Sequence, residues 1–287
     1  MTTPCKFIHL NIKSTFSLLE AMPSVKQIAG KLKELGMPAG GITDTNNLFG
    51  AVEVSKAFPG EGLQPILGLT FGLTREKESK TEHQKPRPDN LTLLVQNEKG
   101  WQNLIQISTK AYLETPPDEP AQIALSELKN FSEGLIALTG SAKTGPLSRL
   151  VQNQQIEEAE NLLRKLSDIF QGRLYIELQR HGLHEEKLVE ADLINLAYKL
   201  NLPLVATNDC RFLEKEQAKA HEVLMSIGAG TTVASPDRPQ MTSEHYLKSE
   251  QEMCDLFADI PEALENSVNI AKRCAFKIPI GMNYMPE

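Results

Sequence analysis

The chain alternates short apolar runs with longer segments whose apolar residues recur every three or four positions. Short runs predict strands and the longer periodic segments predict helices, because side chains repeat every two residues in a strand and every 3.6 in a helix. Strands are expected near 7–12, 39–43, 65–73, 91–96, 134–139, 174–178 and 202–207. Helices are expected near 25–35, 49–58, 100–112, 156–170, 185–200, 214–225 and 260–274. This alternation predicts an α/β fold with largely parallel strand pairing.

Two segments depart from this pattern. The run 74–88 contains no hydrophobic residue, so it has no apolar surface whose burial would offset the entropy of ordering it. We predict a mobile surface loop over 74–90, with a partner-binding loop as the alternative. At the other end, 276–287 has no capping or turn signal and is expected to begin a linker into a further domain. Residues 1–275 are then one domain.

Composition narrows the class of protein. The 30 basic and 37 acidic residues give a net charge of −7, which argues against a nucleic-acid groove built by this chain alone. The four cysteines form no CxxC pair, so neither a zinc ribbon nor a disulfide framework is predicted, and isolated thiols suit a reducing compartment. No apolar run approaches the length of a membrane span, and no signal peptide is evident. The sequence therefore predicts a cytoplasmic protein without membrane contact.

Several segments carry a family resemblance. The first reads FIHLNIKS (7–14) and the last LVATNDCRF (204–212). Between them lie GITDTNNLFG (41–50), PILGLTF (65–71) and LLVQNEKGWQNL (93–104), followed by the polar tail segment 249–264. In this order they resemble the PHP domain that opens the alpha (polymerase) subunit of bacterial DNA polymerase III. The resemblance covers nearly the whole chain apart from the polar loop.

The resemblance implies a distorted seven-stranded (β/α) barrel of the PHP type, with helices outside and the site at the carboxyl-terminal mouth of the strands. That expectation agrees with the predicted strand count and with the usual place of chemistry in parallel barrels. In active members of the family about nine His, Asp and Glu side chains hold a cluster of three metals, which can activate water against a phosphoester.

This chain departs from the family pattern at most ligand positions. Histidines are replaced at Asn11, Lys13, Thr45, Asn90 and Arg211, and a glutamate is replaced at Thr70. Glu20 lies where an acidic residue is common, Asp44 belongs to the family's Thr-Asp pair, and His181 and Asp209 remain as family-like ligands. An amide binds metals weakly, and protonated lysine and arginine have no lone pair to donate. These ten residues are therefore predicted to form a vestigial pocket with no catalytic residue, no metal and no other cofactor.

Lys13 and Arg211 suggest how such a pocket is stabilised. Loss of metal cations would leave buried carboxylates unpaired, which is costly, so we hypothesise that these two cations pair with Asp209 or Asp44. The alternative is that both side chains point into solvent at the rim. His9, in the middle of the first predicted strand, is expected to be a hydrogen-bonded core residue. No role is assigned to His184, His221 or His245, and no nucleophile-elbow, P-loop or GxGxxG motif is present.

Two functional interpretations follow. The resemblance implies a full-length DNA-directed DNA polymerase, a nucleotidyltransferase of DNA replication whose palm carboxylates lie beyond residue 287. This chain would then be an inactive scaffold that docks the proofreading exonuclease (epsilon) subunit and the remaining polymerase domains, without binding DNA directly. The alternative is a metal-dependent phosphoesterase or 3′–5′ exonuclease with a sparse PHP site; the polymerase-like tail segment weighs against a free-standing PHP protein unrelated to replication. Metal content discriminates between them.

Overall fold

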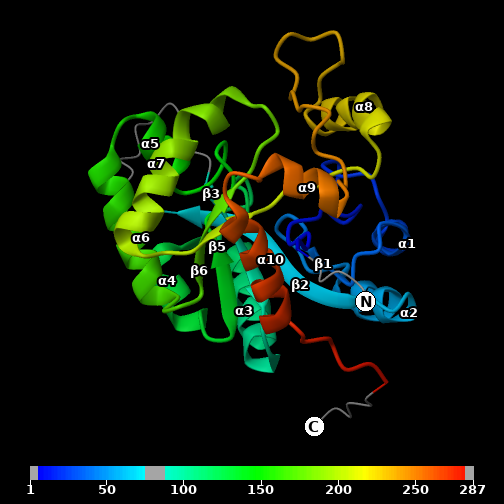
Figure 1. Cartoon of the computed structure of the whole chain (residues 1–287), viewed down its shortest axis with the longest axis horizontal. Coiled ribbons are helices and arrows are strands. Elements are labelled where there is room, and N and C mark those ends of the chain that lie inside the picture. Colours follow the sequence, from blue (N-terminus) through cyan, green and yellow to red (C-terminus); the bar gives the residue numbers. More distant parts are fainter. Residues whose placement is uncertain (1–5, 75–87, 282–287) are drawn as a thin grey trace.

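A curled sheet forms the centre of the molecule (Figure 1). The computed structural model describes residues 6–74 and 88–281, and within them the sheet has seven strands. These are β1 (Ala39–Ile42), β2 (Gln64–Thr74), β3 (Asp89–Val95), β4 (Gln122–Ala124), β5 (Leu135–Leu138), β6 (Leu174–Leu178) and β7 (Leu204–Ala206). The order across the sheet is β1-β2-β3-β5-β6-β7, and β4 pairs with β2 outside this path.

Strand directions confirm the predicted α/β class. β1 with β2, β2 with β4, β5 with β6 and β6 with β7 are parallel pairs. β3 is antiparallel to both of its neighbours, β2 and β5. The sheet is therefore largely parallel, and its curl gives the distorted barrel that the sequence predicts.

The opening segment corrects one prediction. Residues 7–12 do not form a regular strand; they cross between the two edges of the sheet. The Gly41 N–H in β1 donates to the His9 carbonyl at 2.7 Å, and the Lys13 N–H donates to the carbonyl of Cys210, beyond β7, at 2.8 Å. Because its hydrogen bonds are divided between two partners, this segment makes only isolated bridges and joins the edges of the curled sheet.

Helices lie around the sheet, with α1 and α2 on one side and α4, α6 and α7 on the other (Figure 1). Their bounds are α1 (Val25–Glu34), α2 (Ala51–Gly60), α3 (Glu98–Glu114), α4 (Leu125–Leu128), α5 (Ser148–Gln152), α6 (Ile156–Ile169), α7 (His184–Leu200), α8 (Ala218–Gly228), α9 (Glu250–Leu256) and α10 (Pro261–Arg273), with 3₁₀ turns at Lys129–Phe131 and Lys215–Gln217. Ser24 caps α1 as predicted. The helix predicted over 214–225 is instead a 3₁₀ turn followed by α8. The sequence missed β4, α4, α5 and α9, which are too short to show a clear period.

The predicted loop over 74–90 is too long at both ends. Thr74 ends β2, and Asp89 and Asn90 begin β3, so these residues belong to a strand pair. The rest of the predicted loop, 75–87, lies outside the described residues, as do residues 282–287 of the predicted linker. Among the helices that the structure describes, none is long and apolar enough to cross a membrane.

The inner face of the sheet changes character along its length. Alternate residues of a strand share a face. At one end the inner face is apolar, where Ile66, Leu94, Tyr175 and Val205 form a buried cluster with Ile270 and Cys274 at the end of α10. Further along the same strand faces come polar residues, namely Thr70 in β2, Thr92 in β3, Glu177 in β6 and Thr207 just after β7. The fold therefore places a buried polar layer near the carboxyl ends of the parallel strands, which is where the site was predicted.

Candidate functional site: a buried hydrogen-bond network at the barrel mouth

Lys13 lies at the centre of the polar layer and is only 1% exposed. Its Nζ donates to the carbonyl of Thr43 and to the Thr70 hydroxyl, the latter at 2.5 Å. The Thr70 hydroxyl in turn contacts that of Thr92 at 2.9 Å. Burial lowers the Lys13 pKa to about 8, against the opposing influence of Asp209. Lys13 therefore still carries a proton at neutral pH and places a positive charge inside the barrel.

Lys13 does not form the predicted ion pair. Among the described residues no carboxylate oxygen lies within 4.0 Å of its Nζ, so the partners of this cation are neutral oxygen atoms. Neither does it point into solvent, which was the alternative. The hydrogen bonds explain this, because Thr43, just after β1, and Thr70, on the neighbouring strand β2, satisfy the ammonium group within the barrel.

Glu177 anchors the other end of the polar layer and is 2% exposed. Its carboxylate accepts hydrogen bonds from the Asn11 amide at 3.1 Å, the Gln179 amide at 2.9 Å, the Thr207 hydroxyl at 2.5 Å and the Gly140 N–H at 3.0 Å. Four neutral donors thus surround one buried carboxylate. These four donors replace the hydrogen bonds to water that the carboxylate loses on burial.

Asn11 joins the two ends of this layer. Its amide nitrogen donates to Glu177, and its amide oxygen accepts from the Thr43 hydroxyl at 2.9 Å. Thr43 also lies 3.3 Å from the Lys13 Nζ. An unbroken chain of hydrogen bonds therefore runs through the barrel mouth from Glu177 to Thr92. We call it the mouth network; its members are Glu177, Asn11, Thr43, Lys13, Thr70 and Thr92.

Arg211 makes the ion pair that was predicted. Its Nε lies 3.0 Å from Asp209 Oδ2, and its Nη1 lies 3.3 Å from Glu20 Oε2. Glu20 also accepts from the Thr45 hydroxyl at 2.7 Å. Burial by itself would raise the pKa of Asp209, but the charges of Arg211 and Lys13 hold it well below its usual range. Four of the predicted pocket residues thus form a second cluster, in which a guanidinium group bridges two carboxylates.

Asp44 has no cation partner among the described residues, contrary to one form of the hypothesis. Its carboxylate accepts from the Ser14 N–H, the Ser14 hydroxyl and the Ser17 hydroxyl, each at 2.7 Å. Ser17 also accepts from the Thr45 N–H at 3.1 Å. A buried carboxylate with three short hydrogen bonds is satisfied without a metal or a positive side chain. Asp44 therefore holds the loop that contains both serines.

This loop, residues 14–22, is fixed at several points and exposes apolar side chains. The ring of His221 contacts the Glu20 carbonyl at 2.7 Å, which ties the loop to α8. At its tip Leu18 is 67% exposed, and Leu19 is 46% exposed with a φ of 60°. A leucine rarely adopts a positive φ, which requires support from surrounding structure. Asp44, through Ser14 and Ser17, and His221, through the Glu20 carbonyl, supply that support.

His181, the remaining family-like histidine, has both ring nitrogens occupied. Nδ1 lies 2.7 Å from Glu186 Oε1, and Nε2 lies 2.7 Å from the Asn208 carbonyl. The ring stacks on His245 with centroids 3.7 Å apart, and burial lowers the His245 pKa. His245 Nδ1 contacts the Asp209 carbonyl at 3.2 Å. Since both nitrogens of His181 contact oxygen atoms of the protein, a metal ion could bind this ring only by displacing one of these contacts.

Asn90 is the predicted pocket residue that does not join the others. It lies opposite Gly72, one inner-face position along β3 from Thr92. Its N–H donates to the Thr144 carbonyl at 2.6 Å, and its side chain makes no hydrogen bond to the pocket in the described part of the chain. The contact opposite Thr70 is made by Thr92, which the sequence did not single out.

The residues present do not fit the metal cluster that the family resemblance implies. Across 6–74 and 88–281, no group of three or more His, Cys, Asp or Glu side chains lies in an arrangement that could hold a metal ion. Six of the ten positions carry an amide, an ammonium group, a hydroxyl or a guanidinium group instead of a ligand, and five of these, at Asn11, Lys13, Thr45, Thr70 and Arg211, are hydrogen-bonded to protein atoms. We therefore assign no chemical step to a metal at this mouth.

The prediction that His9 is a hydrogen-bonded core residue is confirmed, whereas the sequence did not identify several other residues of the site. His9 is fully buried, with Nε2 2.8 Å from the Lys248 carbonyl and Nδ1 3.4 Å from Cys210 Sγ, and burial lowers its pKa to about 4. The missed contributors are Ser14, Ser17, Thr43, Thr92, Glu177, Glu186, His221 and His245. Glu177 had a visible signal, because a carboxylate inside the apolar run 174–178 requires buried partners. The two missed histidines had none, since their contacts join distant parts of the chain.

Comparison with known proteins identifies the class. A family model described as "PHP domain" matches residues 9–181, which is more than half of the chain. The chain therefore belongs to the PHP domain family, and the sequence-based resemblance to that family is confirmed.

Curated relatives are more specific. The DNA polymerase III subunit alpha of Caulobacter vibrioides is 39% identical over 272 residues, which cover 95% of this chain and 24% of the relative. The corresponding subunit of Pseudomonas aeruginosa is 38% identical over 284 residues, covering 98% of this chain and 23% of the relative. The chain thus spans about a quarter of the length of these relatives. A solved structure of a candidate metal-dependent phosphoesterase from Bifidobacterium adolescentis has a TM-score of 0.46 and 11% identity, covering 72% of this chain and 88% of that one.

Proposed function

We propose that the chain is the N-terminal PHP domain of a replicative DNA polymerase III alpha subunit, acting in the cytoplasm as a non-catalytic scaffold that docks the proofreading exonuclease subunit. The similarity to alpha subunits over 95% or more of the chain supports the first part. The polymerase activity of the whole protein, a DNA-directed nucleotidyl transfer, would belong to domains outside this chain.

The mouth network is the observation that carries the non-catalytic part. An active PHP site needs free lone pairs converging on a metal cluster, and here hydroxyl, amide and ammonium groups satisfy one another across the same space. The network is buried throughout, so each group would need a replacement partner before it could turn toward a metal. Its role is to hold the strands and the loop 14–22 in one arrangement.

Exposed apolar residues near the mouth support a docking role. Leu18, Leu19, Phe49 and Ile227 are between 46% and 67% exposed. Leu19 lies against Gly228 at the end of α8, so the loop tip and Ile227 are neighbours. Grouped apolar residues on a surface commonly mark protein contacts. We place the exonuclease subunit on this surface, which we call the apolar rim and define by these four residues.

Isothermal titration calorimetry of the chain with the exonuclease subunit of the same organism tests the proposal. We expect a complex, and we expect Leu18→Asp with Ile227→Asp to weaken it at least tenfold, since charges would be buried in an apolar contact. The control is Leu188→Asp on α7, where a leucine that is 52% exposed lies away from the rim. The absence of any heat of binding at tens of micromolar would reject the docking role. An equal loss of affinity in the control would reject the apolar rim as the contact surface.

The same preparation distinguishes the alternative function. A phosphoesterase or 3′–5′ exonuclease would hydrolyse a phosphomonoester or a DNA end, and a chelator would abolish the activity. We expect no such hydrolysis. We also expect only weak DNA binding that disappears with modest salt, because a net charge of −7 offers little to neutralise phosphates.

A further inference from the structure

Leu19, at the tip of the loop 14–22, has a backbone conformation that costs free energy. Its φ of 60° lies in the left-handed region, where the Cβ atom of an L-residue comes too close to the following carbonyl oxygen. Asparagine and aspartate tolerate this region better than leucine does. The other non-glycine residues with a positive φ in the described part of the chain are all polar, namely Asn46, Gln154, Asn201 and Asp209. Leu19 is therefore the one apolar side chain that this part of the chain holds in such a conformation.

Burial within the chain offsets only part of this cost. Leu19 is 46% exposed, so nearly half of the residue's surface remains in water. Asparagine at the same position would adopt the left-handed conformation with less strain and would expose no additional apolar surface. A strained residue that the fold itself uses so little points to a function outside the fold.

The surrounding structure fixes Leu19 in place. The Ser17 hydroxyl donates to the buried carboxylate of Asp44 at 2.7 Å, and the Ser17 carbonyl accepts from the Glu20 N–H at 2.9 Å. The ring of His221 in α8 contacts the Glu20 carbonyl at 2.7 Å. Hydrogen bonds therefore hold the residues on both sides of Leu19. A side chain that is fixed before a partner arrives loses less conformational entropy on binding.

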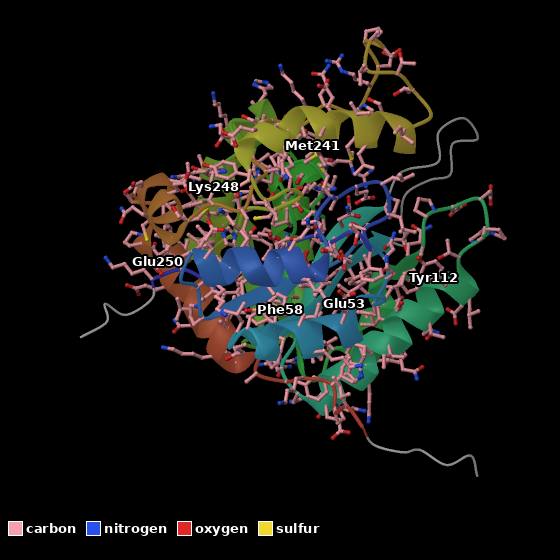
Figure 2. The ribbon with its side chains drawn as sticks, turned by 90° about the vertical axis from the view of Figure 1, so that its right-hand side faces the viewer. Glu53, Phe58, Tyr112, Met241, Lys248 and Glu250 are labelled. Carbon is pink, nitrogen blue, oxygen red and sulfur yellow. The ribbon has the colours of Figure 1, made fainter. Side chains whose placement is uncertain are left out.

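The loop also contacts both of the other segments that form the apolar rim. A Cβ atom added to Gly228, at the end of α8, would lie 3.0 Å from the Cβ of Leu19, so this glycine leaves room for the leucine. On the other side, the amide of Asn47 donates to the Phe16 carbonyl at 2.7 Å, which attaches the turn that carries Phe49 to the loop. Figure 2 shows α8, in yellow, crossing above the blue segment that contains the loop. The strained leucine therefore belongs to the element that joins the rim together.

We propose that Leu19 is the anchor of the apolar rim, a rigidly held leucine that inserts into an apolar pocket on the exonuclease subunit. The inference rests on the proposed function, and it adds which residue dominates the contact and what chemistry the partner offers there. A few central residues supply most of the binding free energy of a protein interface. Burial of the exposed part of Leu19 in the complex removes apolar surface from water that the chain alone leaves exposed.

Leucine-to-asparagine substitutions separate an anchor from a residue of the fold. Leu19→Asn suits the backbone and removes the apolar side chain, so we expect its affinity for the exonuclease subunit, measured by calorimetric titration, to fall about tenfold or more. Its melting temperature should stay within about 2 °C of the wild type or rise, because relief of strain opposes the lost packing. Leu18→Asn, at the more exposed neighbouring position, should weaken binding about threefold or less. Leu19→Met keeps an apolar side chain in place and should also bind within about threefold of the wild type.

Each other outcome decides against the anchor. Equal losses of affinity in Leu18→Asn and Leu19→Asn would overturn it, because the strained position would then have no special role. A melting temperature of Leu19→Asn more than about 4 °C below the wild type would show that the fold itself requires the leucine, and would overturn it as well. A wild type that binds no better than Leu19→Asn would reject this inference and leave the docking role standing. A wild type that does not bind at all would reject the docking role and the anchor with it, so the two failures are distinguishable.

Discussion

Replacing Asp209 with Asn should destabilise the fold mainly by removing one charge. Asp209 has a φ of 37°, a left-handed conformation that asparagine tolerates better than alanine. Asp209→Asn therefore preserves the backbone and a hydrogen-bond acceptor while it removes the partner of Arg211, whose side chain is only 16% exposed. Asp209→Ala would add roughly 1 kcal/mol of backbone strain and would confuse the two effects.

The expected magnitude follows from the geometry of the cluster. Breaking a buried ion pair from one side costs about 3–5 kcal/mol. Arg211 keeps a second contact with Glu20, whose side chain is 38% exposed, so we place the loss near the lower end, at about 3 kcal/mol. At roughly 2–4 °C per kcal/mol, the melting temperature should fall by about 6 °C or more.

Calorimetric melting of four proteins measures this effect. The wild type, Asp209→Asn, Arg211→Gln and the double variant form a cycle whose interaction energy isolates the pair. The lowered pKa of Asp209 means that the pair stabilises the fold above the ordinary carboxyl pKa of 3.8 and loses that contribution as the pH falls further. The gap between wild type and Asp209→Asn should therefore narrow below about pH 4. A gap that stays under about 1 °C at pH 7, or a zero interaction energy, would refute the ion-pair account.

Two other substitutions test the mouth network. For Lys13, the pKa of about 8 in the folded chain lies below the ordinary lysine value of 10.5. The unfolded chain therefore binds more protons between these two pH values, and the stability of the wild type should rise with pH across that window. In urea unfolding, the free energy of unfolding of the wild type should rise by up to about 3 kcal/mol across this window, and that of Lys13→Met should not. Parallel pH profiles for the two proteins would contradict a buried Lys13 with a lowered pKa. Glu177→Gln places an amide among four donors and should cost about 2 kcal/mol in the same assay, whereas Glu157→Gln on the exposed side of α6 should cost nothing measurable.

The sequence was sufficient for the fold because the long elements bury one face each. Helices such as α6, with Leu162, Leu163 and Leu166 on its buried side, show their period clearly. The strands of the sheet are short apolar runs and were placed within a few residues. The opening segment failed as a strand prediction because its partners, β1 and the segment after β7, are nearly 30 and 200 residues away. Apolar periodicity carries no information on such pairings.

The candidate site was predicted in composition more accurately than in contacts. The structure places nine of the ten residues of the predicted pocket in or beside the mouth clusters, and the absence of a bound metal stays a prediction. The family resemblance could not supply partners: Lys13 was expected to face Asp209 or Asp44 and instead faces Thr43 and Thr70. Charge alone suggested an ion pair, whereas strand register decides which oxygen atoms surround the ammonium group.

The stacked histidines illustrate the same limit. His181 and His245 are separated by 64 positions, and the sequence between them gives no sign that their rings lie in contact. Glu186 lies within five residues of His181, on the first turn of α7, and could have been recognised as its partner from helix position alone. A local contact such as the one between His181 and Glu186 is predictable from sequence. The contact between His181 and His245 is not, because it depends on the tertiary packing of distant segments.

The most direct test of the central claim is the metal content of the purified chain, measured by plasma mass spectrometry after purification without chelator and after incubation with zinc, manganese or iron followed by gel filtration. The mouth network satisfies the hydrogen-bonding groups at the positions that would hold metals. We therefore predict less than about 0.1 metal ion per chain under either condition, which is the order of adventitious binding, and no phosphatase activity in the same samples. One or more metal ions per chain, with phosphatase activity that a chelator abolishes and metal restores, would contradict the account.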